Sequence, residues 1–253
     1  MDAIILCGGF ATRLEPITLF VPKPLLPIGG RPIVDYIVHN IIDAGAANII
    51  FSTNSKFYDQ FEYWLRHKKT AGIENKIKLV VEPTTHEGEK FGAIKGINYT
   101  IKTANLSEDL MILAGDNFYN FSLDRLVDHF KKNRKPTIAL HDIKSKDEAR
   151  RFGVVEMDGD KIIGFEEKPK EPKSTLVSTG IYIFPKEMLS KFDNYLSNGE
   201  NPDAPGYFLQ WLIKEAEVNG VVYEEEWYDI GTLDTYKKVF DAHLKGGKTI
   251  KDI

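Results

Sequence analysis

Short apolar runs and helical patterns alternate along residues 2–133, and this order of elements limits the fold more than any other property of the chain. Four runs are continuously apolar, as strands covered on both faces of a sheet usually are: residues 2–7, 48–53, 77–82 and 109–113. Amphipathic patterns lie between and after them at 33–41, 56–66, 92–101 and 123–133, the first with Pro32 at its start and Gly45 beyond its end. The alternation predicts an α/β fold in three layers with a mainly parallel sheet.

The pattern changes near residue 140. Runs at 154–157 and 161–166 flank Asp158-Gly159-Asp160, which is a hairpin signal, and a further strand is predicted at 177–184. Helices are predicted at 185–192, 207–218 and 234–244, with Gly220 placed to end the second, and a strand is predicted at 221–225. We therefore expect a single domain at 1–245 and a loose tail at 246–253. The domain has an approximate internal boundary that separates about 1–140 from 141–245, and the second part contains a small antiparallel lobe.

Composition excludes several classes of protein. The 253 residues are 42% hydrophobic, which is enough for a substantial core, and 33 Lys and Arg against 37 Asp and Glu give a net charge of −4 with no basic excess for nucleic acid. The single cysteine, Cys7, rules out an internal disulfide and a cysteine zinc cluster. No apolar run reaches the roughly 18 residues that span a membrane, and no leader precedes the first strand. We expect a cytoplasmic protein with neither nucleic acid nor membrane as partner.

The loop after the first predicted strand carries a candidate phosphate site. Gly8-Gly9 lies where α/β sheets bind ligands, and glycine-rich loops there expose backbone N–H groups. The spacing matches neither G-x-G-x-x-G nor G-x-x-x-x-G-K-[ST], which disfavours a dinucleotide site and a P-loop. Arg13 can hold phosphate oxygens with its guanidinium fork, and Lys23, between Pro22 and Pro24, can supply a point charge. Taken alone, this Gly-Gly is more often a simple turn beside solvated charges.

The whole stretch from residue 6 to residue 27 resembles G-G-x-G-T-R-L-x-P-x-T-x-x-x-P-K-P-L-x-P, the signature of the sugar-phosphate nucleotidylyltransferases, or NDP-sugar pyrophosphorylases. The chain is similar to their short form, the glucose-1-phosphate thymidylyltransferases. The resemblance implies the Rossmann-like nucleotide-diphospho-sugar transferase fold, with nucleotide bound by about 1–140 and sugar phosphate by 141–245. It also implies that an NTP and a sugar 1-phosphate give an NDP-sugar and pyrophosphate, by Mg²⁺-assisted in-line attack on the α-phosphorus. It assigns nucleotide binding to Leu6, Gly8, Gly9, Thr12, Arg13, Glu82 and Gly92, and catalysis to Arg13, Lys23 and Asp116.

Two acids far apart in sequence match the family's metal positions. Asp116 follows the fourth apolar run, in Leu113-Ala114-Gly115-Asp116, where an isolated Gly-Asp is more often a turn or a helix cap. Asp229 lies in Trp227-Tyr228-Asp229-Ile230-Gly231-Thr232, which resembles the family's D-x-G-T element. By this resemblance Asp116 and Asp229 bind Mg²⁺. One or two carboxylates plus phosphate oxygens are its usual ligands.

The second half carries the matches to the sugar side. Phe152-Gly153-Val154-Val155 and Phe165-Glu166-Glu167-Lys168-Pro169 imply that Gly153 and Glu167 contact sugar hydroxyls and that Lys168 holds the sugar phosphate. Ser178-Thr179-Gly180 matches the strand that lines the sugar pocket, with Thr179 as the binding residue. Without the resemblance, a hairpin with solvated charges would explain these segments equally well.

The base-reading segment matches least well. Glu82 stands where the family has Gln or, in guanylyl enzymes, Glu, and the stretch from Glu82 to Gly92 is longer than the thymidylyl pattern by about two residues. An ionised carboxylate accepts hydrogen bonds only, so Glu82 suits a guanine edge or a pyrimidine N3–H, and the base stays open. Ala11 replaces a glycine of the signature and can restrict the loop, and Cys7 reads as a small buried residue.

Two other functions stay open. A regulatory subunit can bind nucleotide-sugar without turnover, although such a subunit is expected to lose the lysine or the acids. A glycosyltransferase is expected to show a D-x-D metal motif, whereas Asn117-Phe118 follows Asp116. The sequence names neither sugar nor pathway, and it leaves homo-oligomerisation open.

Overall fold

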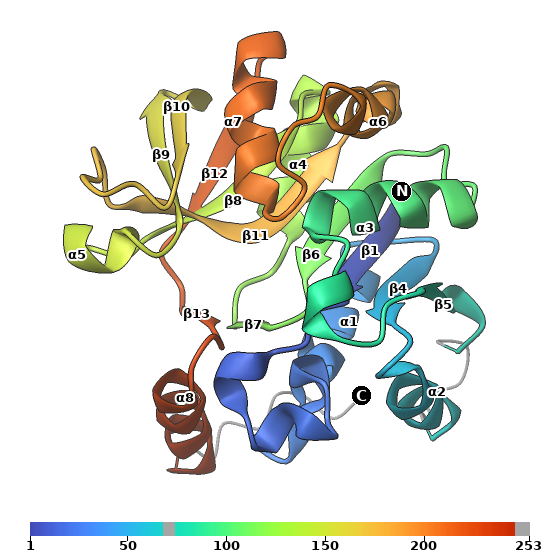
Figure 1. Ribbon diagram of the computed structural model, residues 1–253. Coiled ribbons are helices and arrows are strands. Elements are labelled where there is room, and N and C mark those ends of the chain that lie inside the picture. The colour runs from blue at the N-terminus through green and yellow to red at the C-terminus, as the bar shows by residue number, and fades with distance from the viewer. Residues whose placement is uncertain (68–73, 246–253) are drawn as a thin grey trace.

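The computed structural model describes residues 1–67 and 74–245, and the predicted tail at 246–253 lies outside them. In the described part, nine strands form a single mixed sheet in the order β5-β4-β1-β6-β11-β8-β12-β10-β9 (Figure 1). Their bounds are β1 Asp2–Cys7, β4 Ile49–Asn54, β5 Ile77–Glu82, β6 Leu110–Ala114, β8 Thr137–Asp142, β9 Gly153–Asp158, β10 Lys161–Glu167, β11 Leu176–Phe184 and β12 Asn219–Tyr223. The strands from either side of residue 140 therefore belong to one sheet, joined where β6 pairs with β11.

The sheet is mixed, as the predicted parallel part and antiparallel lobe imply, and its parallel and antiparallel neighbours are equal in number. The neighbours β5-β4, β4-β1, β1-β6 and β8-β12 pair in parallel. The neighbours β6-β11, β11-β8, β12-β10 and β10-β9 are antiparallel. The antiparallel neighbours come from two strands: β11 runs against β6 and β8, and β10 runs against β12 and β9. The predicted hairpin around Gly159 is confirmed as β9 and β10.

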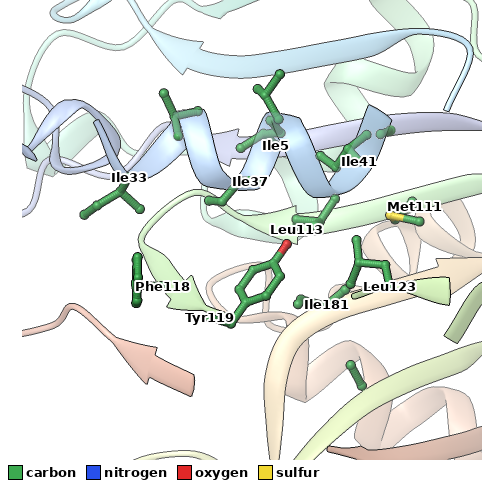
Figure 2. Close-up of a cluster of buried hydrophobic side chains, with 14 of the residues drawn as sticks. Ile5, Ile33, Ile37, Ile41, Met111, Leu113, Phe118, Tyr119, Leu123 and Ile181 are labelled. Carbon is green, nitrogen blue, oxygen red and sulfur yellow. The ribbon is translucent and has the colours of Figure 1, made fainter. Parts of the chain in front are cut away.

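Helices cover both faces of the sheet, which confirms the three layers (Figure 1). The helices are α1 Ile33–Asp43, α2 Tyr58–Arg66, α3 Ala93–Thr103, α4 Asp124–Asn133, α5 Lys146–Ala149, α6 Ser190–Ser197, α7 Pro205–Glu215 and α8 Leu233–Lys245. Alternate residues of β1 enter two separate cores: Ile5 belongs to the core that also contains residues of α1, α2 and α4, and Ile4 to the core that contains residues of α3, α6 and α7. Figure 2 shows the first core, with Ile37 and Ile41 of α1 gathered with Leu113 of β6.

Two predicted elements differ in place. The helix predicted at 185–192 begins later, because Pro185 is extended and a 3-10 turn at Lys186–Met188 precedes α6. The strand predicted at 221–225 lies two residues earlier, since Gly220 pairs with Ile138 instead of ending a helix. A Cβ on Gly220 would lie 2.6 Å from Cδ1 of Leu140, so close packing requires this glycine inside β12.

Two short ribbons complete the fold. β2 (Pro27–Ile28) pairs with β3 (Arg31–Pro32), and β7 (Asn117–Tyr119) pairs with β13 (Trp227–Asp229). The second ribbon brings the chain around residue 229 to the end of β6, and α8 follows it directly. No helix within 1–67 and 74–245 is both long and apolar enough to cross a bilayer.

Candidate active site

Two adjoining cavities open where β1, β5 and β6 end. The larger, of about 390 Å³, is lined by all the residues predicted to bind nucleotide and by the predicted catalytic residues: Leu6, Gly8, Gly9, Thr12, Arg13, Lys23, Glu82, Gly92 and Asp116. The smaller, of about 280 Å³, is lined by the residues predicted to bind sugar phosphate: Gly153, Glu167, Lys168 and Thr179, with Asp229 beside them. Asp116 lines both cavities and so lies at their junction.

Lys23 and Asp116 form an ion pair at this junction. The Nζ of Lys23 lies 2.7 Å from Oδ2 of Asp116, although the two residues are 93 positions apart. Lys23 begins a short 3-10 turn between the extended Pro22 and the buried Pro24, which holds the lysine backbone in place. Its side chain is only 14% exposed, so the charge faces the cleft and not bulk water.

Asp229 lies beside Asp116 because of the β7–β13 ribbon. Asp229 is paired with Asn117, and the N–H of Ile230 donates to the carbonyl of Asp116 at 3.0 Å. Burial, followed by the negative charge of Asp116, raises the pKa of Asp229 from 3.8 to about 6. The positive charges of Lys23, Arg151 and Arg13 act in the opposite direction. Two acids and three bases therefore converge on one cleft.

The acidic pair fits a divalent cation only if the ligand completes the coordination. Within the described residues no group of three or more His, Cys, Asp or Glu side chains could hold a metal ion. Asp116 and Asp229 are, however, neighbouring carboxylates whose negative charges repel each other. Mg²⁺ is usually held by one or two such carboxylates, with phosphate oxygens as the remaining ligands. The donor set thus suits a magnesium–phosphate complex better than a metal bound by protein alone.

Glu82 is a buried acid that lines the larger cavity. It ends β5, and its Oε1 accepts a hydrogen bond from Ser52 Oγ at 3.0 Å, which in turn accepts one from Thr100 Oγ1 at 2.9 Å. Burial raises the pKa of Glu82, while the Ser52 hydrogen bond and the charge of Lys95 lower it. The lengthened loop that follows Glu82 also lines this cavity, through Glu87, Lys90 and Phe91.

Glu167 occupies the equivalent place in the smaller cavity. It ends β10, and its carboxylate is buried with the Lys168 Nζ 3.4 Å from Oε1. Burial raises the pKa of Glu167 and the charge of Lys168 opposes this shift. Lys168 itself has a positive φ of 50°, a conformation that non-glycine residues seldom adopt, and it lines the cavity with a side chain that is 58% exposed.

The hydroxyl of Thr179, the residue predicted to bind the sugar, is engaged within the sheet. Thr179 is fully buried and its Oγ1 donates to the carbonyl of Ala139 at 2.8 Å, so the hydroxyl belongs to the sheet. Its own carbonyl accepts a hydrogen bond from Asn117 Nδ2. Thr179 therefore lines the cavity without a free hydroxyl.

The two departures in the glycine loop have clear structural consequences. Ala11 has φ 52° and ψ 36°, the left-handed region that suits glycine, so its Cβ costs about 1 kcal/mol. The Thr18 hydroxyl donates to the Ala11 carbonyl at 2.8 Å and holds this turn. Cys7 is 2% exposed and burial raises its thiol pKa, which confirms a buried residue.

One basic residue and one connecting segment of the site were not predicted from the sequence. Arg151 lines the smaller cavity, and its positive charge lowers the pKa of Asp229. Its place two residues before Gly153 could have indicated a role in the site. Residues 202–206, here called the strap, lie on both cavities: Asp203 and Pro205 on the larger, and Ala204 to Gly206 on the smaller.

The strap also closes the first turn of α3. The N–H groups of Ala93 and Ile94 donate to the carbonyls of Asp203 and Pro202 at 3.1 and 2.9 Å. Gly92 has φ +78°, and a Cβ on it would lie 2.6 Å from the Pro202 oxygen. The prolines of the strap suggest a turn in sequence, but its contact with α3, about 110 residues earlier by number, is a tertiary feature.

Comparisons with known proteins give one family. The model of the family described as nucleotidyl transferase matches residues 2–246. The bifunctional protein GlmU of Methanococcus aeolicus is 33% identical over 232 residues, which cover 91% of this chain and 51% of that protein. The glucose-1-phosphate adenylyltransferase of Thermotoga maritima is 31% identical over 263 residues, covering 96% of this chain and 60% of that protein.

Solved structures share the fold. A Bacillus anthracis protein, provisionally named a glucose-1-phosphate thymidylyltransferase and crystallised with sucrose, matches with a TM-score of 0.83 at 24% identity, over 97% of this chain and 96% of that one. The chain spans between about half and two thirds of the length of the curated relatives.

Proposed function

The chain belongs to the nucleotidyl transferase family, and we propose that it transfers a nucleotidyl group from an NTP to a sugar 1-phosphate, releasing pyrophosphate and an NDP-sugar. The relatives named for glucose-1-phosphate adenylyl and thymidylyl transfer support this class of substrates. Because the chain covers only part of those curated proteins, we leave the base and the sugar open.

The observation that carries the proposal is the meeting of two cavities at one ion pair. Asp116 lines both cavities and is paired with Lys23, so a group bound in the larger cavity and a group bound in the smaller one would meet there. We assign the larger cavity to the NTP and the smaller one to the sugar phosphate. The antiparallel hairpin of β9 and β10 would then form the sugar-binding lobe.

In the reaction, an oxygen of the sugar phosphate attacks the α-phosphorus and the bond from that phosphorus to the β-phosphate oxygen breaks. The nucleophile is already an anion, so no side chain needs to remove a proton. The residues act by bringing two polyanions together and neutralising the charge that moves to pyrophosphate. Arg13 would hold the β- and γ-phosphates, and Lys23 the transferring phosphoryl group.

The smaller cavity supplies the remaining positive charge. Lys168, at the mouth of the cavity, would orient the attacking phosphate, and Arg151 would oppose the negative charge of Asp229 and the sugar phosphate. Asp116 and Asp229 would hold Mg²⁺, which would neutralise charge on the phosphate oxygens. Gly8 and Gly9 line the larger cavity, and their main-chain N–H groups would face the triphosphate.

The test is a matrix of ATP, CTP, GTP, UTP and dTTP against glucose, N-acetylglucosamine, mannose and galactose 1-phosphates, with Mg²⁺ and pyrophosphate as the readout. We expect turnover for at least one pair, and Asp116→Asn as control should lose it while remaining folded. Binding of a nucleotide-sugar without pyrophosphate release would instead identify a regulatory subunit. Transfer of sugar from a nucleotide-sugar to an acceptor would identify a glycosyltransferase.

A further inference from the structure

Each of the two cavities contains one buried glutamate at the end of a strand. Glu82 ends β5 in the larger cavity and is 6% exposed, and Glu167 ends β10 in the smaller one with a side chain that is 8% exposed. Each has a single lysine as its main opposing charge, Lys95 and Lys168 respectively. A carboxylate is expensive to bury, so these two positions require a structural explanation.

A helical glycine lies against each carboxylate. Gly96, the fourth residue of α3, would place a Cβ 2.6 Å from Oε1 of Glu82, and Gly206, the second residue of α7, would place one 1.8 Å from Oε2 of Glu167. Both glycines have ordinary helical backbone, so no left-handed conformation requires them. Glycine lowers the stability of a helix relative to alanine, and the space taken by the carboxylate explains its presence.

A second glycine faces each carboxylate from a strand or its following loop. The Cβ of an alanine at Gly8 would lie 2.8 Å from Oε1 of Glu82, and at Gly153 it would lie 3.1 Å from Oε2 of Glu167. Each glutamate thus enters a space between two residues that lack a side chain. Ser52 fixes one oxygen of Glu82 within this space.

We propose that Gly96 and Gly206 are specificity-determining positioning residues, one for each substrate. The absence of a methyl group lets Glu82 lie against α3 and Glu167 lie against α7, which sets where each cavity presents its hydrogen-bond acceptor. Glu82 would accept from N–H groups of a nucleobase and Glu167 from hydroxyls of a sugar. The inference rests on the proposed function for the identity of these ligands.

An added methyl group would displace the carboxylate and not the fold. The atom that it meets is in both cases the end of a flexible side chain, which can rotate away. Moving from 1.8 Å to an ordinary contact of 3.4 Å shifts the Glu167 oxygen by more than 1 Å. A misplacement of about 1 Å can cost up to about a hundredfold in rate or affinity.

Gly96→Ala and Gly206→Ala test the proposal, with each variant as the control for the other. With the NTP and sugar phosphate that the wild type uses best, Gly206→Ala should raise the KM for sugar phosphate about tenfold or more and change the KM for NTP less than about twofold. Gly96→Ala should do the reverse and should also alter the preference among the five triphosphates. Both variants should remain folded, because the nearest atom that the methyl group meets is the end of a side chain and not backbone.

A second pair of variants separates displacement of the carboxylate from other effects. In a Glu167→Ala background, Gly206→Ala should add no further change in KM, and the same should hold for Gly96→Ala in a Glu82→Ala background. Additive losses, or equal changes in both KM values from a single variant, would overturn the proposal. So would crystal structures of the two alanine variants in which the carboxylates have not moved.

Failure of the proposed function is distinguished from failure of the positioning role by the activity of the wild-type protein. A wild-type protein that releases no pyrophosphate with any pair would reject the proposed reaction. The positioning claim would then be tested by calorimetry with the same five triphosphates and four sugar phosphates as probes. Loss of triphosphate binding in Gly96→Ala and of sugar-phosphate binding in Gly206→Ala would support it, and unchanged binding in both would overturn it.

Discussion

Replacing Asp229 by asparagine should stabilise the ligand-free protein while abolishing its activity. The folded protein raises the pKa of this carboxyl from 3.8 to about 6, chiefly by burial and by the charge of Asp116. A raised acid pKa means that the fold disfavours the ionised form. The penalty is therefore absent below about pH 4, grows between the two values, and is complete above about pH 6.

The size of the effect follows from the shift. About two pKa units at about 1.4 kcal/mol each give a penalty of about 3 kcal/mol, which is an upper bound because the repulsion belongs to the pair of Asp116 and Asp229. For a chain of this size the free-energy gain corresponds to a rise of roughly 6–12 °C in melting temperature at most. Asparagine keeps the shape of the side chain and removes the charge.

The assay is thermal unfolding of both proteins without Mg²⁺ at about pH 8 and about pH 4, where the penalty is complete and absent. We expect Asp229→Asn to melt higher than the wild type at the upper pH and equally at the lower one. An equal gain at both pH values, or no gain at the upper pH, would refute the electrostatic argument. Adding Mg²⁺ with triphosphate should stabilise the wild type more than the variant.

Three further predictions follow from individual contacts. Lys23→Ala removes the cation paired with Asp116 at 2.7 Å and should lower kcat about a hundred- to thousandfold in the pyrophosphate assay. Circular dichroism should show that the variant is folded, and near-normal turnover would show that Lys23 is not catalytic. Ser52→Ala removes the hydrogen bond to Glu82 and should raise the KM for NTP about tenfold or more with the KM for sugar phosphate unchanged, whereas an effect on both would argue for a general structural role. Hydrogen bonds from Lys144 and Thr175 lower the pKa of Asp142 to about 2, so its stabilising effect is complete above about pH 4 and is lost as the pH falls to about 2. Asp142→Asn should therefore lower the melting temperature by a few degrees at neutral pH, and a loss that persists at about pH 2 would contradict this assignment.

The sequence predicted most accurately those strands whose residues are buried on both faces of the sheet. β1 and β5 were placed at their observed bounds, because their residues enter the cores on both faces and so read as continuous apolar runs. The ribbon of β7 and β13 was missed, since three residues per strand carry no periodic signal. Gly220 was misread because a glycine after a helical pattern has the same appearance whether it ends a helix or packs inside a strand.

In the candidate site too, the residues within motifs were predicted, and the contacts between distant segments were not. The resemblance of the loop after β1 named Lys23, and that of a second motif named Asp116, which the fold joins in an ion pair. The availability of the Thr179 hydroxyl could not be read from sequence, because it depends on the carbonyl of Ala139 in a neighbouring strand. The contribution of Arg151 also depends on the approach of two distant segments.

The strap has a consequence for recombining this protein with its relatives. Residues 202–206 belong to the second half of the chain, yet their carbonyls complete the hydrogen bonding of α3 in the first half. A chimera joined at about residue 140 would match an α3 from one parent with a strap from another, so both its cavities would change together. Exchange of one substrate preference should therefore succeed only when the strap is transferred together with Gly92 and α3.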